Sequence, residues 1–202
     1  MARRADVLDL AVLGLLHDTP LHGYELRKRL GTVLGPFRAL SYGTLYPCLK
    51  HLSERGWITE SSGTADAAAS TGRRARIVYE LTAAGKEHFE TLVDECGPAS
   101  WEDESFGVRF AFFARTPTDV RLRILEGRRS RLEERLDAVS ASVARSRERA
   151  DQYTLELQRH GLESVQREVR WLGELISNER QTTSDAPGEP APPATSPPAP
   201  SV

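Results

Sequence analysis

The sequence has few cysteines and no long apolar run, and both shortages narrow the class of protein. Cys48 and Cys96 are far apart, which excludes a disulfide-rich secreted scaffold and leaves no metal-ligand spacing. The longest apolar stretch, residues 7–16, contains Asp9 and is much shorter than the roughly 20 residues that span a bilayer. Asp6 and the missing small-residue cleavage site argue against a signal peptide. We expect a cytoplasmic protein that makes no use of a membrane.

Motifs of the common enzyme classes are also missing. The chain has no Gly-rich phosphate loop and no G-x-S-x-G nucleophile turn. Its five histidines are scattered, without the spacing that metal ligands need. The sequence therefore predicts neither an enzyme nor a bound cofactor or metal.

Charge is distributed unevenly, although the net charge is only -2. Residues 1–80 carry 11 Lys and Arg against 8 Asp and Glu, so this part has a net charge of +3. Residues 81–202 carry 16 against 21, a net charge of -5. The modest asymmetry places the positive potential in the first part of the chain.

The order of elements in the first part is that of a winged helix-turn-helix. Apolar periodicity, turn residues and β-branched runs mark the element boundaries. The expected elements are helices over residues 6–16 and 21 to about 33, a third helix from Ser41 to a stop at Gly56, strands over 57–60 and 76–81, and a helix that opens at Thr82. Residues 61–75 lack periodicity and predict a long tip between the two strands.

The third helix has two faces of different character. Leu45, Leu49 and Leu52 form an apolar stripe, whereas Gly43 and Pro47 break the usual rules of helix composition. A helix presented to the major groove would explain the polar face, because hydroxyls and free backbone N–H groups bind phosphate and Gly allows close approach. The candidate DNA contacts on this helix are Ser41, Tyr42, Gly43, Thr44, Tyr46, Lys50 and His51. The alternative is that the two tyrosines pack beneath the preceding helix.

Basic residues elsewhere in the first part support the same interpretation. Arg73, Arg74 and Arg76 lie at the start of the returning strand, where a wing meets the DNA backbone. Lys28 lies on the second helix beside two arginines and is a further candidate for phosphate contact. Taken in isolation, these residues are better explained as ordinary solvated charges.

Three segments together resemble the PadR family of bacterial transcriptional regulators. They are "LAVLGLLHDTPLHGYELRKRL", "SYGTLYPCLKHLSERGWI" and "GRRARIVYELTAAGKEHF", and they cover about residues 7–90. The resemblance implies a dimeric, repressor-type regulator of double-stranded DNA whose C-terminal helices form the dimer. Trp57 stands where the family has a smaller apolar residue, and residues 61–71 look longer than the usual wing tip. These two departures affect the packing and the contacts of the wing.

The second part predicts two amphipathic helices. Apolar and small residues from Leu132 to Leu157 repeat at coiled-coil spacing, and His160-Gly161 is expected to break the helix before a second such run. Their length and pairing are similar to the C-terminal helices of the longer-tailed, virulence-activator type. An antiparallel hairpin of this kind has too little core alone and should pack against a second copy. The expected dimer contacts are Leu132, Leu136, Val139, Val143, Leu157, Val165, Val169, Leu172 and Ile176.

Aromatic residues are concentrated in the second part as well. Some relatives bind flat small molecules near the dimer interface, so an effector pocket and plain core packing are both open for this set. Aromatics at helical spacing are more often core. The residues are Trp101, Phe106, Phe110, Phe113, Tyr153 and Trp171.

These patterns divide the chain into three parts and leave more than one function class open. We expect a winged helix-turn-helix domain over residues 1–95, a helical dimerisation domain over 96–180 and a disordered Pro-rich tail over 181–202. The fold class is mainly α with a small β-hairpin. The leading hypothesis is a homodimeric repressor on a palindromic operator. The alternatives are a winged-helix protein-interaction protein and a ligand-sensing dimer without its own operator.

Overall fold

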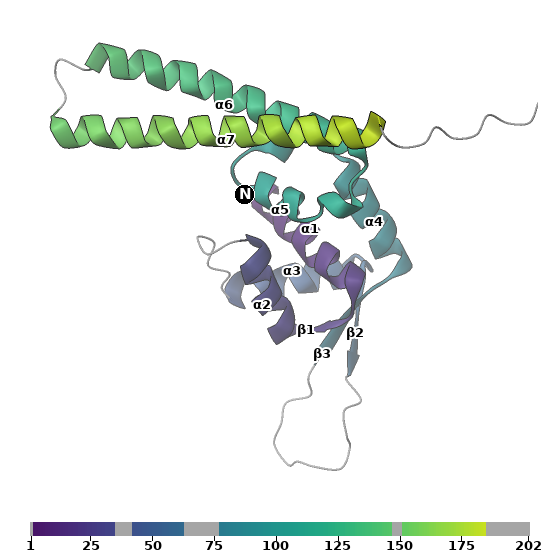
Figure 1. Cartoon of the computed structure of the whole chain (residues 1–202). Helices are drawn as coiled ribbons and strands as arrows, with labels where there is room; N and C mark the ends of the chain where they lie inside the picture. Colours follow the sequence, from purple (N-terminus) through teal and green to yellow (C-terminus); the bar gives the residue numbers. More distant parts are fainter. Residues whose placement is uncertain (1, 35–41, 63–76, 147–150, 185–202) are drawn as a thin grey trace, which may run out of the picture.

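A computed structural model describes residues 2–34, 42–62, 77–146 and 151–184 (Figure 1). The winged part consists of helices α1 (Ala2–Asp18), α2 (Gly23–Leu34), α3 (Tyr42–Glu54) and α4 (Ala83–Asp94) and a small sheet of β1 (Leu21–His22), β2 (Ile58–Ser62) and β3 (Ile77–Leu81). The short elements η1 (Pro98–Trp101), α5 (Phe106–Ala111) and η2 (Phe113–Arg115) lead to the long helices α6 (Thr118–Ser146) and α7 (Gln152–Ser184). The predicted winged helix-turn-helix followed by helical elements is confirmed.

The second helix begins later than predicted. Leu21 and His22 were expected to open the second helix, but they form β1 and pair with Tyr79 and Val78 of β3. Helix α2 therefore begins at Gly23. Helical periodicity is read from neighbouring residues, whereas β1 forms because of a partner strand more than fifty residues away in the chain. The assignment of Leu21 and His22 to the helix was therefore wrong.

Both predicted wing strands and the helix after them are present, but β2 begins one residue later than expected and includes Ser61 and Ser62, which were assigned to the tip. Antiparallel β2 and β3 pair from Ile58 opposite Leu81 to Ser62 opposite Ile77. Thr82 caps α4, since its hydroxyl accepts a hydrogen bond from the Gly85 N–H at 3.0 Å. Gly85 lies so close to the start of the wing that a Cβ there would collide with the carbonyl oxygen of Trp57. This contact fixes the position of α4 relative to β2.

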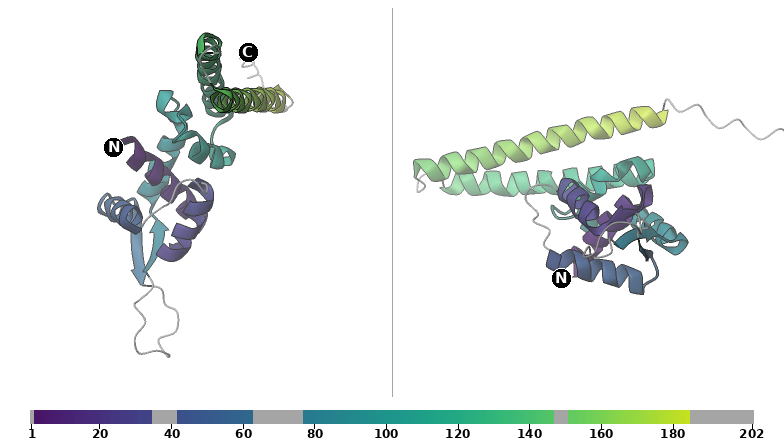
Figure 2. Two further views of the ribbon diagram at one scale, coloured as in Figure 1. Left: turned by 90° about the vertical axis from the view of Figure 1, so that its left-hand side faces the viewer. Right: turned by 90° about the horizontal axis from the view of Figure 1, so that it is seen from below.

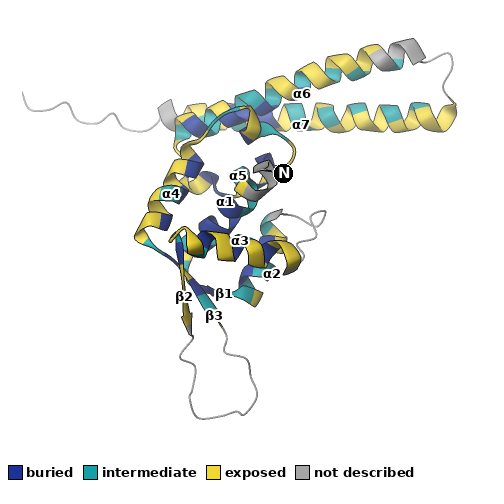
Figure 3. Cartoon of the chain, turned by 180° about the vertical axis from the view of Figure 1, so that it is seen from behind, coloured by how far each residue is buried: buried dark blue, intermediate teal, exposed yellow. Residues whose placement is uncertain are grey.

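Helix α5 packs against the winged unit although it follows the expected boundary at residue 95. The Phe112 ring, one residue after α5, occupies the space that a side chain at Gly14 of α1 would need. Val108 and Phe112 belong to the same buried cluster as the leucines of α1, α2 and α3 (Figure 3). The Arg109 guanidinium donates to the carbonyls of Leu92 and Glu95 at 2.9 and 2.8 Å, which caps the C-terminal end of α4.

The two long helices form the predicted antiparallel hairpin, but with its turn in another place. Helix α6 ends at Ser146, and α7 runs from Gln152 without interruption through His160 and Gly161. The expected break at His160-Gly161 is therefore wrong, and Tyr153 and Leu157 belong to the second helix. Helix α7 also continues past Gln181, where the tail was expected to begin, to Ser184; residues 185–202 lie outside the described part of the chain. The two helices lie side by side in Figures 1 and 2.

Arginines on α6 hold the hairpin together. Arg121 bonds Glu179 of α7 at 2.7 Å, and Arg128 bonds Glu168 at 2.8 Å. Arg128 also reaches Asp103 at 2.5 Å and the Trp101 carbonyl at 3.0 Å. Its charge is buried, and buried charges need this kind of paired environment. The base of the hairpin is therefore fixed both to itself and to the segment that follows α4.

No helix within the described ranges is long and apolar enough to cross a membrane. Over the same residues, no group of three or more His, Cys, Asp or Glu side chains is arranged to hold a metal ion.

The close approach at Gly85 predicts a specific loss of stability. Gly85→Ala should lower the free energy of unfolding by about 1–3 kcal/mol, because the new methyl group meets a backbone oxygen that cannot rotate away. Gly31→Ala in α2 is the matched control, since a Cβ there meets nothing within 4 Å and should stabilise the helix by about 0.5–1 kcal/mol. Urea denaturation at one fixed protein concentration measures both. Equal effects of the two substitutions would contradict the packing described for α4.

Candidate nucleic-acid interface

Burial fixes which side of α3 faces outward. Leu45, Leu49 and Leu52 are almost completely buried, as the apolar stripe predicted, and they anchor the helix on the core. The helix ends in a Schellman arrangement: Gly56 has a φ of 71°, its N–H donates to the Ser53 carbonyl, and the Trp57 N–H donates to that of Leu52. The buried leucines and the fixed C-terminal end of the helix together keep the opposite face of α3 in solvent.

The outward face of α3 carries the candidate contacts that the structure describes. Gly43, Thr44, Tyr46, Lys50 and His51 are all exposed. Ser41 lies outside the described residues, and Tyr42 is the first residue of α3. Pro47 lies on the same face, and because proline has no N–H it cannot donate to the carbonyl of Gly43. The expected polar face thus exists as one continuous surface of a single helix.

The sequence left open whether Tyr46 contacts DNA or packs beneath the preceding helix, and its position in the structure is compatible with both. Its side chain is 49% exposed, and its hydroxyl would be 3.8 Å from a Cβ built on Gly23 at the start of α2. The ring therefore rests beside the preceding helix while much of it stays in solvent. This position suits a residue that is held by packing and still presents a hydroxyl group to a ligand.

Lys50 and His51 have different surroundings. Lys50 is in a long ion pair with Glu54, 3.7 Å away, and both side chains are mostly exposed. Such a surface pair contributes at most about 1 kcal/mol, so a phosphate could replace the carboxylate at little cost. The His51 ring lies edge-on to Trp57, with 6.2 Å between centroids. His51 is therefore positioned by an aromatic contact, whereas Lys50 is free to reach outward.

Trp57 packs against the edge of the main hydrophobic cluster and also contacts α4. Its indole stacks on the His88 ring at a centroid separation of 3.6 Å and an angle of 16°. The Arg55 guanidinium lies 5.6 Å from the indole centroid on the exposed side. Burial lowers the pKa of His88, so its neutral form is favoured in this stack. The larger residue is accommodated by the partner on α4.

A hydrogen bond between α1 and α3 lies beneath the exposed face. The Cys48 thiol donates to Oδ1 of Asp9 at 3.1 Å. Burial raises the pKa of the Asp9 carboxyl, against the opposing effects of the Cys48 bond and of His51 and His88. Burial, together with the neighbouring Asp9 charge, raises the pKa of the Cys48 thiol well above its usual range. The thiol therefore acts here as a donor that links the two helices.

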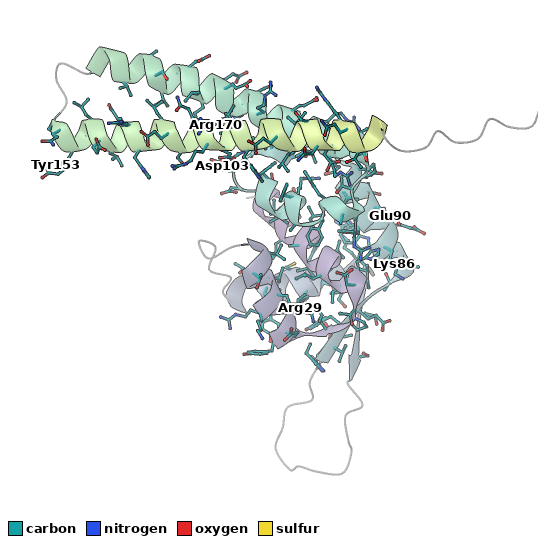
Figure 4. All side chains as sticks on the ribbon, viewed as in Figure 1. Arg29, Lys86, Glu90, Asp103, Tyr153 and Arg170 are labelled. Carbon is teal, nitrogen blue, oxygen red and sulfur yellow. The ribbon has the colours of Figure 1, made fainter. Side chains whose placement is uncertain are left out.

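One exposed residue of this surface was missed by the sequence analysis. Tyr24 is not among the predicted contacts, but it is 70% exposed in the first turn of α2. Lys28, which was predicted as a contact, is exposed one turn further along the same helix. The four-residue spacing of these two side chains could have placed them on one face. Figure 4 labels Arg29, which pairs with Glu25 at 3.1 Å.

The structure describes the two wing strands, but the arginines predicted to contact DNA from the wing lie outside the described residues. Strands β2 and β3 extend away from the α6–α7 hairpin (Figure 1). Arg73, Arg74 and Arg76 fall in the range 63–76, and the expected long tip falls there too. Their contact with DNA stays a prediction.

The N-terminal part also matches a known family. Residues 12–91 match the model of the transcriptional regulator PadR-like family. The N-terminal part of the chain is therefore similar to this family over its winged unit. The PadR-like segment ends within α4, three residues before the last residue of that helix.

Curated and solved relatives carry the same family name. The negative transcriptional regulator PadR of Bacillus subtilis (strain 168) is 33% identical over 84 residues, which are 40% of this chain and 42% of that protein. The chain thus spans about two fifths of the length of this curated relative. The crystal structure of Bacillus subtilis PadR with operator DNA is 21% identical, covers 86% of this chain and 99% of its own, and has a TM-score of 0.40. A PadR-like regulator from Bacillus cereus is 19% identical, with coverages of 89% and 99% and a TM-score of 0.38.

Four of the six candidate effector residues come together. Phe106, Phe110, Phe113 and Trp171 form a cluster with centroid separations from 4.9 to 6.4 Å. Phe106 and Phe113 are buried in the second hydrophobic cluster. For these two residues the structure favours core packing over an effector pocket. The Trp101 ring packs instead on Gly127 of α6, at 2.6 Å from a Cβ built there. Tyr153, in the first turn of α7, is 86% exposed and lies away from the cluster (Figure 4).

The expected dimer contacts divide into two groups. Leu132, Leu172 and Ile176 are buried within the single chain, where they fill the base of the hairpin. They leave no surface for a second copy, so their assignment as dimer contacts is corrected to packing inside the hairpin. Partly exposed members of the set are Leu136, Val139, Val143, Val165 and Val169, and Leu157 is 72% exposed.

The buried Asp9 carboxyl predicts a pH dependence of stability. Because its pKa is raised in the folded state, the stability it contributes is present below the pKa of a free aspartate, about 3.9, and is lost as pH rises through the folded value. Asp9→Asn keeps an acceptor for the Cys48 thiol and cannot ionise. Its free energy of unfolding should therefore improve relative to the unsubstituted chain as pH rises from about 4 to 7.

Chemical denaturation at fixed protein concentration across this range measures the difference. Asp94→Asn, at the exposed end of α4, is the control substitution. A difference between the Asp9→Asn variant and the unsubstituted chain that stays constant, or moves the other way, would show that burial does not control this carboxyl.

Proposed function

We propose that the chain is a homodimeric transcriptional repressor that binds double-stranded DNA through α3 and the wing. The observation that carries the proposal is the exposed polar face of α3, with Thr44, Tyr46 and Lys50 opposite a fully buried leucine stripe. In a helix-turn-helix the second helix of the motif enters the major groove, and its first residues meet base edges and phosphates. The PadR-like family match over residues 12–91 supports the same role.

Helix α2 would hold the protein on the DNA backbone. Tyr24 and Lys28 lie on one exposed face of α2, and a hydroxyl and an ammonium group are both suited to phosphate oxygens. Contacts of this kind set register and affinity without reading sequence. Thr44, Tyr46, Lys50 and His51 are then the candidates for base contact, and Gly43 allows the sugar-phosphate strand to approach.

The α6–α7 hairpin would form the dimer, so residues 96–180 act as the dimerisation domain and residues 1–95 as the DNA-binding domain. Tyr153 and Leu157 lie one helical turn apart on α7 and are both largely exposed. Large exposed apolar side chains at such spacing favour burial against another protein surface. Two copies would present two recognition helices to successive major grooves, and thus bind a palindromic operator in the cytoplasm. An effector held near Phe110 and Trp171 could relieve repression.

Substitutions on the exposed face of α3 test the DNA assignment. Lys50→Ala and Tyr46→Phe should each weaken binding to the promoter region of the protein's own gene about 5- to 150-fold, which corresponds to the 1–3 kcal/mol of a good base or charged contact. Lys86→Ala is the matched control, because Lys86 is an exposed lysine on α4 (Figure 4). Gel-shift titrations at two salt concentrations measure affinity and counterion release together.

The expected pattern is weaker binding for the two α3 variants, unchanged binding for Lys86→Ala, and a steep fall in affinity with salt for all. Unchanged affinity in both α3 variants would remove this face from the interface. Binding that is absent, or that is insensitive to salt in the unsubstituted chain, would favour a protein-interaction role.

A charge on the exposed part of α7 tests the dimer. Leu157→Glu should shift the chain from dimer toward monomer, since the substitution places a carboxylate where apolar contact is expected. Gln166→Glu is the control: it is exposed and lies nine residues further on, half a turn out of phase on the same helix. Sedimentation equilibrium measures both. A dimer that survives Leu157→Glu intact must be formed by another surface.

A further inference from the structure

A cavity lies where the winged unit meets the segment that leads to the hairpin. It has a volume of about 180 Å³ and is lined by residues of α1, the end of α4, the chain around η1, and α5. Helices α1 and α4 are part of the winged unit, whereas η1 contacts α6. The cavity therefore joins parts of the chain that the proposed function assigns to DNA binding and to dimerisation.

Part of its lining is apolar. Val7 and Leu10 of α1 and Leu92 of α4 line it, and Ala99 of η1 contributes a small side chain. Leu10 and Leu92 are buried members of the main hydrophobic cluster. A pocket with apolar walls and a few polar groups is the usual form of a small-molecule site, and this volume suits a ligand smaller than a typical drug.

The polar lining is acidic. The carboxylates of Asp6, Glu95, Glu102 and Glu104 line the cavity, with Ser105 beside them. Two of these carboxylates form long ion pairs: Glu95 lies 3.5 Å from Arg109, and Glu102 lies 3.7 Å from Arg131. Both carboxylates are at least partly exposed and their ion pairs are long, so these oxygens can be shared with a second cation.

The basic residue of the lining is engaged in structure. Arg109 donates to the carbonyls of Leu92 and Glu95, and its side chain is only 11% exposed. Because these bonds cap α4, the guanidinium cannot turn toward a ligand without exposing the end of that helix. An anionic ligand would therefore meet several carboxylates and no available positive group on the described lining.

We infer that this cavity binds a small organic cation, namely an amine or quaternary ammonium group attached to a short apolar body. The apolar part lies against Val7, Leu10 and Leu92, and the charge lies near Glu95 and Glu102. The site is distinct from the aromatic cluster of Phe110 and Trp171, since neither residue lines it. Since it contacts both α4 and the segment after it, a ligand there bridges the two parts of the chain.

A pair of probes that differ in charge tests the inference without DNA. Phenethylamine and 3-phenylpropanoate have the same ring and a similar length, but opposite charge at neutral pH. Isothermal titration calorimetry with the full chain should give at least tenfold tighter binding for phenethylamine. The variants Glu95→Gln and Glu102→Gln should each weaken phenethylamine binding threefold or more, because each removes one negative charge from the lining.

Two further variants distinguish the site from general charge attraction. Ala99→Leu should abolish phenethylamine binding by filling the cavity from an exposed position that tolerates a larger side chain. Glu90→Gln removes a charge from the exposed face of α4 outside the cavity (Figure 4) and should leave binding unchanged. Circular dichroism confirms that each variant is folded.

Several results would overturn the inference. They are equal affinity for the two probes, no saturable binding of phenethylamine by the folded chain, or full affinity in either the Glu95→Gln or the Ala99→Leu variant. None of these results bears on the DNA assignment of α3, which is measured separately by the gel shifts.

Discussion

The burial of one leucine stripe on α3 determines what the rest of the winged unit presents to solvent. Leu45, Leu49 and Leu52 fix the rotation of the helix about its axis, so that Thr44, Tyr46 and Lys50 face outward. The Cys48–Asp9 hydrogen bond adds a directional link to α1 that an apolar contact alone would lack. The Schellman end at Gly56 then turns the chain into β2. The orientation of the proposed DNA surface is the consequence of this packing on the opposite side of the helix.

A second constraint connects this unit to the hairpin. Phe112 fits against Gly14, and Arg109 caps α4, so the segment after α4 is held to the winged unit by a close contact and by hydrogen bonds. Arg128 performs the corresponding role at the base of the hairpin through Glu168, Asp103 and the Trp101 carbonyl. A change at the joint can therefore reach both parts. A ligand at this position would act by binding one arrangement of these contacts more tightly than another.

Features set by local sequence were predicted well. The leucine stripe of α3, the Thr82 cap and the wing strands follow from periodicity, capping chemistry and β-branched composition. Features that depend on distant partners were not predicted. Strand β1 exists only because β3 lies beside it. Tyr24 is exposed because of the way α2 packs. The break expected at His160-Gly161 failed because a single glycine costs a helix only about 1 kcal/mol, which packing of α7 on α6 offsets. Leu132, Leu172 and Ile176 have the pattern of a helix seam, but a pattern alone does not say whether the partner helix is in the same chain.

Hydrogen–deuterium exchange with bound DNA tests the central claim most directly. The DNA would be a duplex recovered by sequencing genomic fragments that the purified protein selects. The account predicts slower exchange in peptides covering α3, residues 42–54, because backbone and side chains of that face become covered. Exchange in α3 that is unchanged by DNA, with slowing confined to α6 and α7, would contradict it.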